Sequence, residues 1–283
     1  QAVQKMDEAL VASVREMLVP FSTEYLAYQR IKRQVPAEAL PEFSVARAGG
    51  PNAAQVFERA SGAPLTKGVP GFFTRDGYRK QLLPAVQQAA LQLAREEPWL
   101  RGTKADPTRL KDTLPGGALA DRVRRLYFEE YIKTWDAYLA DVRLVRLAGL
   151  ERSIAVARVV SSADSPLAAY MRGVAAETTL VPPASAPSAL DKVTDKAKAD
   201  LKNVTGGPLA SGPPLERMVD DHFARLRRQV EGTPAPIDDT LKLFNEIYLQ
   251  LSALDAAQKS KSPPPSGAGA ANVKAAAGQL PEP

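Results

Sequence analysis

The residue best suited to proton transfer in this chain is its single histidine, His222, which stands beside Asp220 and Asp221. A histidine changes its charge near neutral pH and can act as a general acid or base. The surrounding pattern predicts a helix, however, and adjacent residues of a helix do not face one another. We therefore expect His222 to be solvated or to cap a helix rather than to form a catalytic pair.

Paired carboxylates could also do chemistry, because two acidic groups on either side of a bond carry out glycoside hydrolysis. Neighbouring residues of an α-helix point about 100° apart, so one doublet cannot flank one bond. We expect these residues to lie on solvated helix faces and at helix ends. The acidic doublets are Glu96-Glu97, Glu129-Glu130, Asp220-Asp221 and Asp238-Asp239.

The chain contains no cysteine, which excludes disulfides, thiol nucleophiles and cysteine-based metal sites. A metal site with one histidine would need carboxylates for nearly all its ligands, and no such spacing is present. The motif GxSxG of serine hydrolases and the phosphate-binding motif GxxxxGK[ST] are also missing. We predict that the chain is not an enzyme and has no catalytic residue, metal or cofactor.

The net charge of +5 comes from 37 Lys+Arg against 32 Asp+Glu, spread along the chain. The best basic cluster is Arg143, Arg146, Arg152 and Arg158, but apolar residues alternate with these arginines at helical spacing. We expect a solvated face beside a buried stripe, and no nucleic-acid binding.

No apolar run approaches the ~18 residues that a membrane-spanning helix needs. The sequence also lacks a secretory signal, because Gln1 stands in a charged stretch with a helical pattern. We therefore expect this chain to be a piece of a larger protein, with no membrane span of its own.

The elements that position these residues are predicted to be helices, giving a mainly α, multi-helix bundle with one long central helix and little or no β-structure. The strongest periodic signal covers 117–148 and predicts a helix of about thirty residues, roughly 45 Å long. Further helices are expected at 4–19, 23–34, 52–60, 75–97, 106–114, 166–180, 215–230 and 237–257. Another helix, with Ile154, Val156, Val159 and Val160, is expected after Gly149. Pro84 should kink the helix after Thr74 near Gln81, and 43–46 has the alternation of a short strand.

Composition divides the chain into four parts. Residues 1–181 form a helical domain, and 182–212 are a Pro/Gly/Lys-rich linker or mobile loop. Residues 213–258 form a helical pair, and 259–283 are a flexible, low-complexity tail.

The segment from Val69 to Tyr78 is the most distinctive in the sequence. Pro70 and the two glycines should make an extended segment followed by a turn, and Thr74 should cap the next helix. The adjacent Phe72 and Phe73 must be buried somewhere, so we expect this loop to pack against helices. We predict a structural motif made of Val69, Pro70, Gly71, Phe72, Phe73, Thr74, Gly77, Tyr78, Trp99, Tyr127, Tyr131 and Trp135.

The same segment resembles the Val-Pro-Gly-Leu-Phe-Thr…Gly-Tyr block of the IcmF/TssM family, the inner-membrane component of type VI secretion systems. Further blocks follow in the family's order at 96–102, 126–135, 165–167, 177–180 and 221–223. Pro98 is a modest departure, because the family usually runs from an acidic residue directly to the tryptophan.

The resemblance implies a structural subunit that is anchored in the inner membrane, projects through the periplasm and self-associates. Its implied partners are a TssL-like inner-membrane protein and a TssJ-like outer-membrane lipoprotein. This chain would be the periplasmic helical pillar that links the membrane anchor to a C-terminal partner-binding domain. The nucleotide-binding motif of some members lies on a cytoplasmic part that this chain does not contain.

Two other functions remain open from the sequence. A peptidoglycan-acting hydrolase would need a cleft with two carboxylates at glycosidase-like separation. A soluble helical adaptor outside any secretion system would need no membrane anchor at all.

Overall fold

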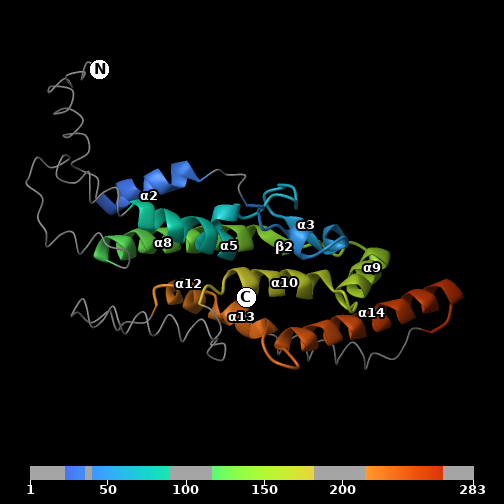
Figure 1. Ribbon diagram of the computed structural model, residues 1–283. Coiled ribbons are helices and arrows are strands. Elements are labelled where there is room, and N and C mark those ends of the chain that lie inside the picture. The colour runs from blue at the N-terminus through green and yellow to red at the C-terminus, as the bar shows by residue number, and fades with distance from the viewer. Residues whose placement is uncertain (1–22, 36–39, 90–116, 182–213, 264–283) are drawn as a thin grey trace, which may run out of the picture.

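The computed structural model describes residues 23–35, 40–89, 117–181 and 214–263. Over these residues helices predominate and one two-stranded sheet occurs, so the predicted mainly α fold is confirmed (Figure 1). Several expected features lie outside the described residues: Trp99, the helices at 4–19 and 106–114, the 182–212 segment and most of 259–283.

The centre of the fold is α8 (Ala118–Asp141), a helix of 24 residues that is about 36 Å long at 1.5 Å per residue. It confirms the predicted long helix but ends at Asp141 instead of 148. The strand β2 (Val142–Leu144) begins directly afterwards. The predicted helix was too long because Val142 and Val145 continue its apolar face, although β-branched side chains also suit a strand.

The strand β2 pairs with β1 (Phe57–Arg59) in an antiparallel ladder, with Phe57 opposite Leu144 and Arg59 opposite Val142. The predicted helix over 52–60 is therefore too long. The observed helix α4 (Ala53–Val56) has only four residues, and Phe57 already has extended dihedral angles. The sheet ties the end of α8 back to the N-terminal part of the chain.

The prediction of a strand at 43–46 was wrong except at Phe43. Phe43 forms an isolated bridge with Val69, and the chain then turns into α3 (Val45–Ala48). The reason is Ser44, whose side chain accepts a hydrogen bond from the Arg47 amide and so caps a helix.

The helix α2 (Thr23–Gln34) confirms the helix predicted at 23–34 and packs on α8. Its buried face carries Ala27, Tyr28 and Ile31, which recur at steps of one, three and four.

The 69–78 loop leads into three short helical segments. These are the 3₁₀ turn η1 (Gly71–Phe73), α5 (Arg75–Gly77) and the π-helical turn η2 (Tyr78–Leu82). Pro84 has no N–H to donate to the carbonyl four residues earlier, and the Leu83 amide bonds instead to the Tyr78 carbonyl five residues back. The irregularity predicted near Gln81 therefore takes the form of a π turn.

The helices α9 (Leu150–Val160) and α10 (Pro166–Glu177) follow β2, as predicted. Gly149 turns the chain into α9 with a φ of 83°, a conformation that side-chain-bearing residues rarely adopt. Ser165 caps α10 through its hydroxyl, and Pro166 occupies the first helical position.

The last described segment contains α12 (Arg217–His222), α13 (Ala224–Val230) and α14 (Pro236–Ser260). The single helix predicted at 215–230 is broken at Phe223. These helices contact earlier ones: α12 packs on α8, α13 on α10, and α14 on α9 (Figure 1). Val219 and Phe223 belong to the same buried core as the aromatic residues of α8. The domain division of the chain stays a prediction.

Candidate functional site

The 69–78 loop is held by backbone hydrogen bonds and by its own threonine. The amide and carbonyl of Val69 exchange bonds of 2.8 and 3.0 Å with the carbonyl and amide of Phe43. The Thr74 hydroxyl donates to the Gly71 carbonyl at 2.7 Å and accepts from the Gly77 amide at 3.1 Å. Thr74 is therefore the helix cap that the sequence predicted, and it also fixes the preceding turn.

Glycines are required in this loop because the backbone is crowded there. A Cβ on Gly77 would lie 2.2 Å from the Gly71 carbonyl oxygen and 2.4 Å from that of Phe72. A Cβ on Gly71 would lie 2.3 Å from the Leu40 carbonyl oxygen. Neither gap can hold a carbon atom, and backbone carbonyls cannot swing aside as side chains can.

The loop brings its aromatic residues onto α8. Phe73 and Tyr78 are buried, while Phe72 is half-buried. The Phe73 ring stacks on Tyr127 at a centroid distance of 5.6 Å, and Phe72 meets Tyr127 edge-on at 5.2 Å. Edge-on and offset arrangements suit the quadrupoles of aromatic rings and add to the energy of burial.

Four aromatic residues on one side of α8 form what we term the aromatic ladder: Tyr127, Tyr131, Trp135 and Tyr138. Their spacings of four, four and three residues place them along one helix face, and all four are buried. Burial raises the pKa of the Tyr127 and Tyr131 hydroxyls well above the ordinary value, so both remain neutral donors.

Each ladder residue uses its polar atom to bind a backbone group outside α8, and two of the four bind the 69–78 loop. The Tyr127 hydroxyl donates to the Phe72 carbonyl at 2.7 Å. The Trp135 Nε1 donates to the Phe73 carbonyl at 2.8 Å. These two bonds fix the 69–78 loop to α8 through main-chain atoms.

The other two ladder residues hold two further segments. The Tyr131 hydroxyl donates to the Glu177 carbonyl at 2.8 Å, at the end of α10. The Val45 amide, at the start of α3, donates to the Tyr138 hydroxyl at 2.9 Å. The ladder therefore joins the loop, α3 and α10 to one helix by hydrogen bonds that are buried or partly buried.

Ion pairs lie around the ladder. The Arg124 guanidinium donates to Glu216 Oε1 at 2.6 Å and to the Tyr78 hydroxyl at 3.0 Å, and Tyr78 also donates to Glu216. On the α2 side, the Tyr28 hydroxyl donates to Glu130 at 2.6 Å. Both groups tie a tyrosine to an acidic residue far away in the sequence.

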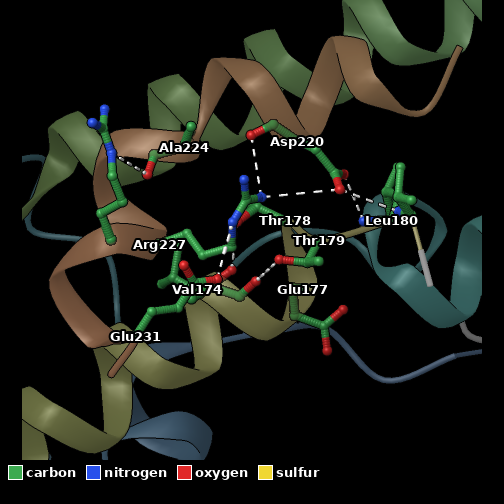
Figure 2. A network of polar contacts seen from close by, with 12 residues as sticks. Val174, Glu177, Thr178, Thr179, Leu180, Asp220, Ala224, Arg227 and Glu231 are labelled. Atoms are coloured by element: carbon green, nitrogen blue, oxygen red, sulfur yellow. Dashed lines mark hydrogen bonds and ion pairs between the residues drawn. The ribbon is translucent and has the colours of Figure 1, made fainter. Parts of the chain in front are cut away.

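Asp220 holds the chain where it leaves α10 (Figure 2). Its carboxylate accepts hydrogen bonds from the Leu180 amide at 2.7 Å and the Val181 amide at 3.3 Å. Arg227 lies 3.9 Å from the same carboxylate and donates to the Asp220 carbonyl at 3.2 Å. Burial raises the pKa of Asp220 despite these donors.

The residues considered for catalysis in the sequence instead bind other parts of the fold. His222 is exposed and its Nε2 lies 2.9 Å from Asp136 on α8, so it joins two helices at the surface. Asp220 binds backbone amides, and Glu130 binds Tyr28 and Lys32. Within the described residues, no group of three acidic or histidine side chains could hold a metal ion.

A hollow of about 170 Å³ lies beside the 69–78 loop. Its charged lining comes from Glu42, Arg47, Asp76 and Glu177. Each carboxylate is already engaged: Glu42 with the Gly68 amide, Glu177 with the Arg75 amide, and Asp76 with Lys80. The hollow therefore lacks free groups of the kind that acid–base chemistry needs.

Several residues that organise this site were not predicted. Tyr138 could have been found, because it continues the stripe three residues after Trp135. Arg124, Glu216 and Asp220 gave no such signal, since their partners lie 92 and 40 residues away in the chain. What the arrangement does is hold backbone segments together, and it presents no reactive centre.

Comparison with known proteins places this chain in a family. Residues 1–179 match the family described as "IcmF-related: Intracellular multiplication and human macrophage-killing", which is more than half of the 283 residues. The chain belongs to the IcmF-related family. The resemblance carried by the 69–78 loop and the blocks after it is thereby confirmed.

A relative in Pseudomonas aeruginosa, "Type VI secretion system component TssM1", is 36% identical over 265 residues. The match takes in 88% of this IcmF-related chain but only 24% of the relative, so the chain spans about a quarter of that protein. A solved structure titled "Type VI secretion system membrane core complex" matches with a TM-score of 0.49 and 16% identity, over 86% of this chain and 38% of that one.

Family membership agrees with the prediction that this chain is not an enzyme, since the relative is named as a component of a secretion system. In the described ranges, no helix combines the length and the apolar character needed to cross a bilayer.

Proposed function

We propose that this chain is the periplasmic helical part of a TssM-like component of the type VI secretion membrane complex, where it acts as a rigid pillar. Support comes from the identity to the P. aeruginosa component over most of this chain. In the full-length protein the pillar would link an inner-membrane anchor to a C-terminal partner-binding domain. TssL-like and TssJ-like proteins, and other copies of the same component, are the proposed partners.

The observation that carries the mechanical part of this proposal is the aromatic ladder. A pillar transmits force only if its helices cannot slide past one another. The ladder opposes sliding because directional hydrogen bonds join α8 to three other segments. These segments are the 69–78 loop at Phe72 and Phe73, the end of α10 at Glu177, and the start of α3 at Val45. Breaking any of these bonds would leave a buried backbone group without a partner, which costs about 1–3 kcal/mol.

The proposed location can be tested because this chain has no cysteine. A single cysteine at the exposed position Ala253 on α14 would be placed in the full-length protein, with any other cysteines removed. We expect a membrane-impermeant maleimide to label it once the outer membrane is permeabilised. Labelling that requires disruption of the inner membrane would contradict a periplasmic location.

The proposed role is tested by weakening the ladder in the full-length protein. We expect Trp135→Phe combined with Tyr131→Phe to reduce type VI secretion into the medium, while the tyrosine control Tyr248→Phe leaves it unchanged. Immunoblots would confirm that both proteins accumulate equally. Normal secretion by a double variant with a clearly lower melting temperature would contradict the need for rigidity.

A further inference from the structure

The strand β2 and the turn after it expose an unusual set of side chains. Leu144 and Leu147 are 43% and 53% exposed, among the most exposed large apolar residues of the described chain. Arg143 and Arg146 alternate with them and are also exposed. We call residues 143–147 the Arg–Leu edge.

The backbone of this edge has unused hydrogen-bonding groups. The Val145 amide bonds to the Val56 carbonyl, and the Ala60 amide bonds to the Asp141 carbonyl. In an antiparallel ladder, residue pairs that exchange hydrogen bonds alternate with pairs that do not. Since the bonds just named join 56 to 145 and 60 to 141, Phe57 and Leu144 form a pair without hydrogen bonds to each other. The amide and carbonyl of Leu144 therefore point away from β1, and no other described element bonds to them.

The arginines of the edge outnumber the acidic residues opposite them. Among the described residues neither Arg143 nor Arg146 forms an ion pair, although Glu58 stands opposite Arg143 in the ladder. Arg59 in the partner strand differs, because it lies 2.7 Å from Asp141. The outer side of the sheet consequently carries a local positive charge beside two exposed leucines.

The free backbone groups, the exposed leucines and the positive charge distinguish among three kinds of binding partner for the Arg–Leu edge. A second copy pairing antiparallel through the same edge would bring the arginines of both copies close together, which is unfavourable. A lipid surface would leave the Leu144 amide and carbonyl without partners in an apolar medium. An extended acidic segment satisfies all three features, because it supplies backbone partners, apolar contacts and opposite charge.

We propose that the Arg–Leu edge binds an extended polypeptide segment with alternating acidic and apolar residues, which adds to β2 as a third strand. Arg143 would pair with its carboxylates on one face of the sheet, and Leu144 would contact its apolar side chains on the other. Arg146 and Leu147, beyond the end of β2, would add positive charge and apolar surface next to the bound segment. The contact is an interaction surface separate from the aromatic ladder.

The test uses the full 283-residue chain and a fluorescein-labelled Glu-Leu-Glu-Leu-Glu-Leu peptide, followed by fluorescence anisotropy. We expect binding that is at least tenfold tighter than that of the matched Lys-Leu peptide. Binding should weaken when NaCl is raised from 50 to 500 mM, since exposed charges are screened. The double variant Arg143→Glu, Arg146→Glu should lose at least tenfold in affinity.

A second pair of variants isolates the backbone contribution. Leu144→Pro removes the outward amide without touching the β1–β2 bonds, while Leu144→Thr removes the same leucine and keeps the amide. We expect the proline variant to bind at least threefold more weakly than the threonine variant, with similar melting temperatures. Equal binding by these two variants would overturn strand addition.

Other outcomes would also overturn the proposal. One is equal affinity for the Glu-Leu and Lys-Leu peptides. A second is binding of phosphatidylglycerol vesicles, lost in the double arginine variant, without any binding of the Glu-Leu peptide. A third is a dimer in sedimentation experiments that the double variant abolishes.

Discussion

The indole Nε1 of Trp135 donates a 2.8 Å hydrogen bond to the backbone carbonyl of Phe73, 62 residues earlier in the chain. Both residues are buried, so no water competes for this bond. It is one of the two hydrogen bonds from α8 that fix the position of the 69–78 loop, and it leads to the first prediction.

Replacing Trp135 by Phe removes the indole donor and leaves an aromatic ring in place. The Phe73 carbonyl then lacks its partner, and part of the indole volume becomes a cavity. We expect a loss of about 2–4 kcal/mol in the free energy of unfolding, measured by urea denaturation. Tyr248→Phe, in α14, is the control and should change this free energy by less than about 0.5 kcal/mol.

Phe73→Ala tests whether the loop is anchored by burial. Phe73 is buried against Tyr127, whereas the adjacent Phe72 is only half-buried. We expect Phe73→Ala to cost about 3–5 kcal/mol and Phe72→Ala clearly less, in thermal and urea unfolding. An unchanged melting curve for Phe73→Ala would mean that this side chain does not anchor the loop.

Gly77→Ala tests the close approach of the loop to its own helix. The new Cβ would meet two backbone carbonyl oxygens at 2.2 and 2.4 Å, so the backbone must move. We expect a destabilisation of about 2–3 kcal/mol or more in urea. Gly173→Ala is the matched control, because its Cβ would meet only side chains at 3.2 Å or beyond. The ranking of the two variants is the result that matters.

Asp220 should matter through its backbone bonds. Asp220→Ala leaves the Leu180 and Val181 amides without an acceptor, which should cost about 1–3 kcal/mol in the free energy of unfolding. Asp220→Asn keeps one acceptor oxygen and should cost less. Hydrogen exchange of the Leu180 amide is the direct measurement, and it should accelerate most in the alanine variant.

Asp141 gives the fold a dependence on acidic pH. Hydrogen bonds from the Ser61 hydroxyl and amide, together with Arg59, lower the pKa of Asp141 from 3.8 to about 2. Because the folded pKa lies below the ordinary value, the ionised carboxylate stabilises the fold above about pH 4. This contribution is lost as the pH falls from about 4 towards 2.

The check compares urea midpoints of the wild type and Asp141→Asn at pH 7 and pH 2.5. The two proteins should differ at pH 7, and the difference should be clearly smaller at pH 2.5. Ser61→Ala should shift the wild-type curve in the same direction as Asp141→Asn. A difference of constant size at both pH values would show that Asp141 acts without its charge.

Local signals in the sequence were sufficient for much of the fold. Thr74 is a capping residue in the sequence, and it caps the helix predicted after it. Pro84 indicated the irregular turn that η2 forms. These predictions held because each depends on hydrogen bonds within a few residues of the signal.

The parts that were missed depend on contacts across the chain. Val142 fits the periodicity of α8, and only pairing with Arg59 makes it a strand residue. The pairing of Arg124 with Glu216 spans 92 residues, and no local pattern marks either side chain. Sequence reasoning therefore named most of the aromatic residues of the site, but it missed Tyr138 and the ion pairs around the ladder.

The aromatic ladder has a consequence for how this protein can change over evolutionary time. Its bonds end on the carbonyls of Phe72, Phe73 and Glu177 and on the amide of Val45, groups that almost any amino acid would supply. Substitutions on the receiving side therefore keep the attachment, whereas each donor or acceptor on α8 must keep its own chemistry. One helix therefore carries the side-chain chemistry of these four bonds, while burial of Phe73 and the crowding at Gly71 and Gly77 set separate limits on the loop.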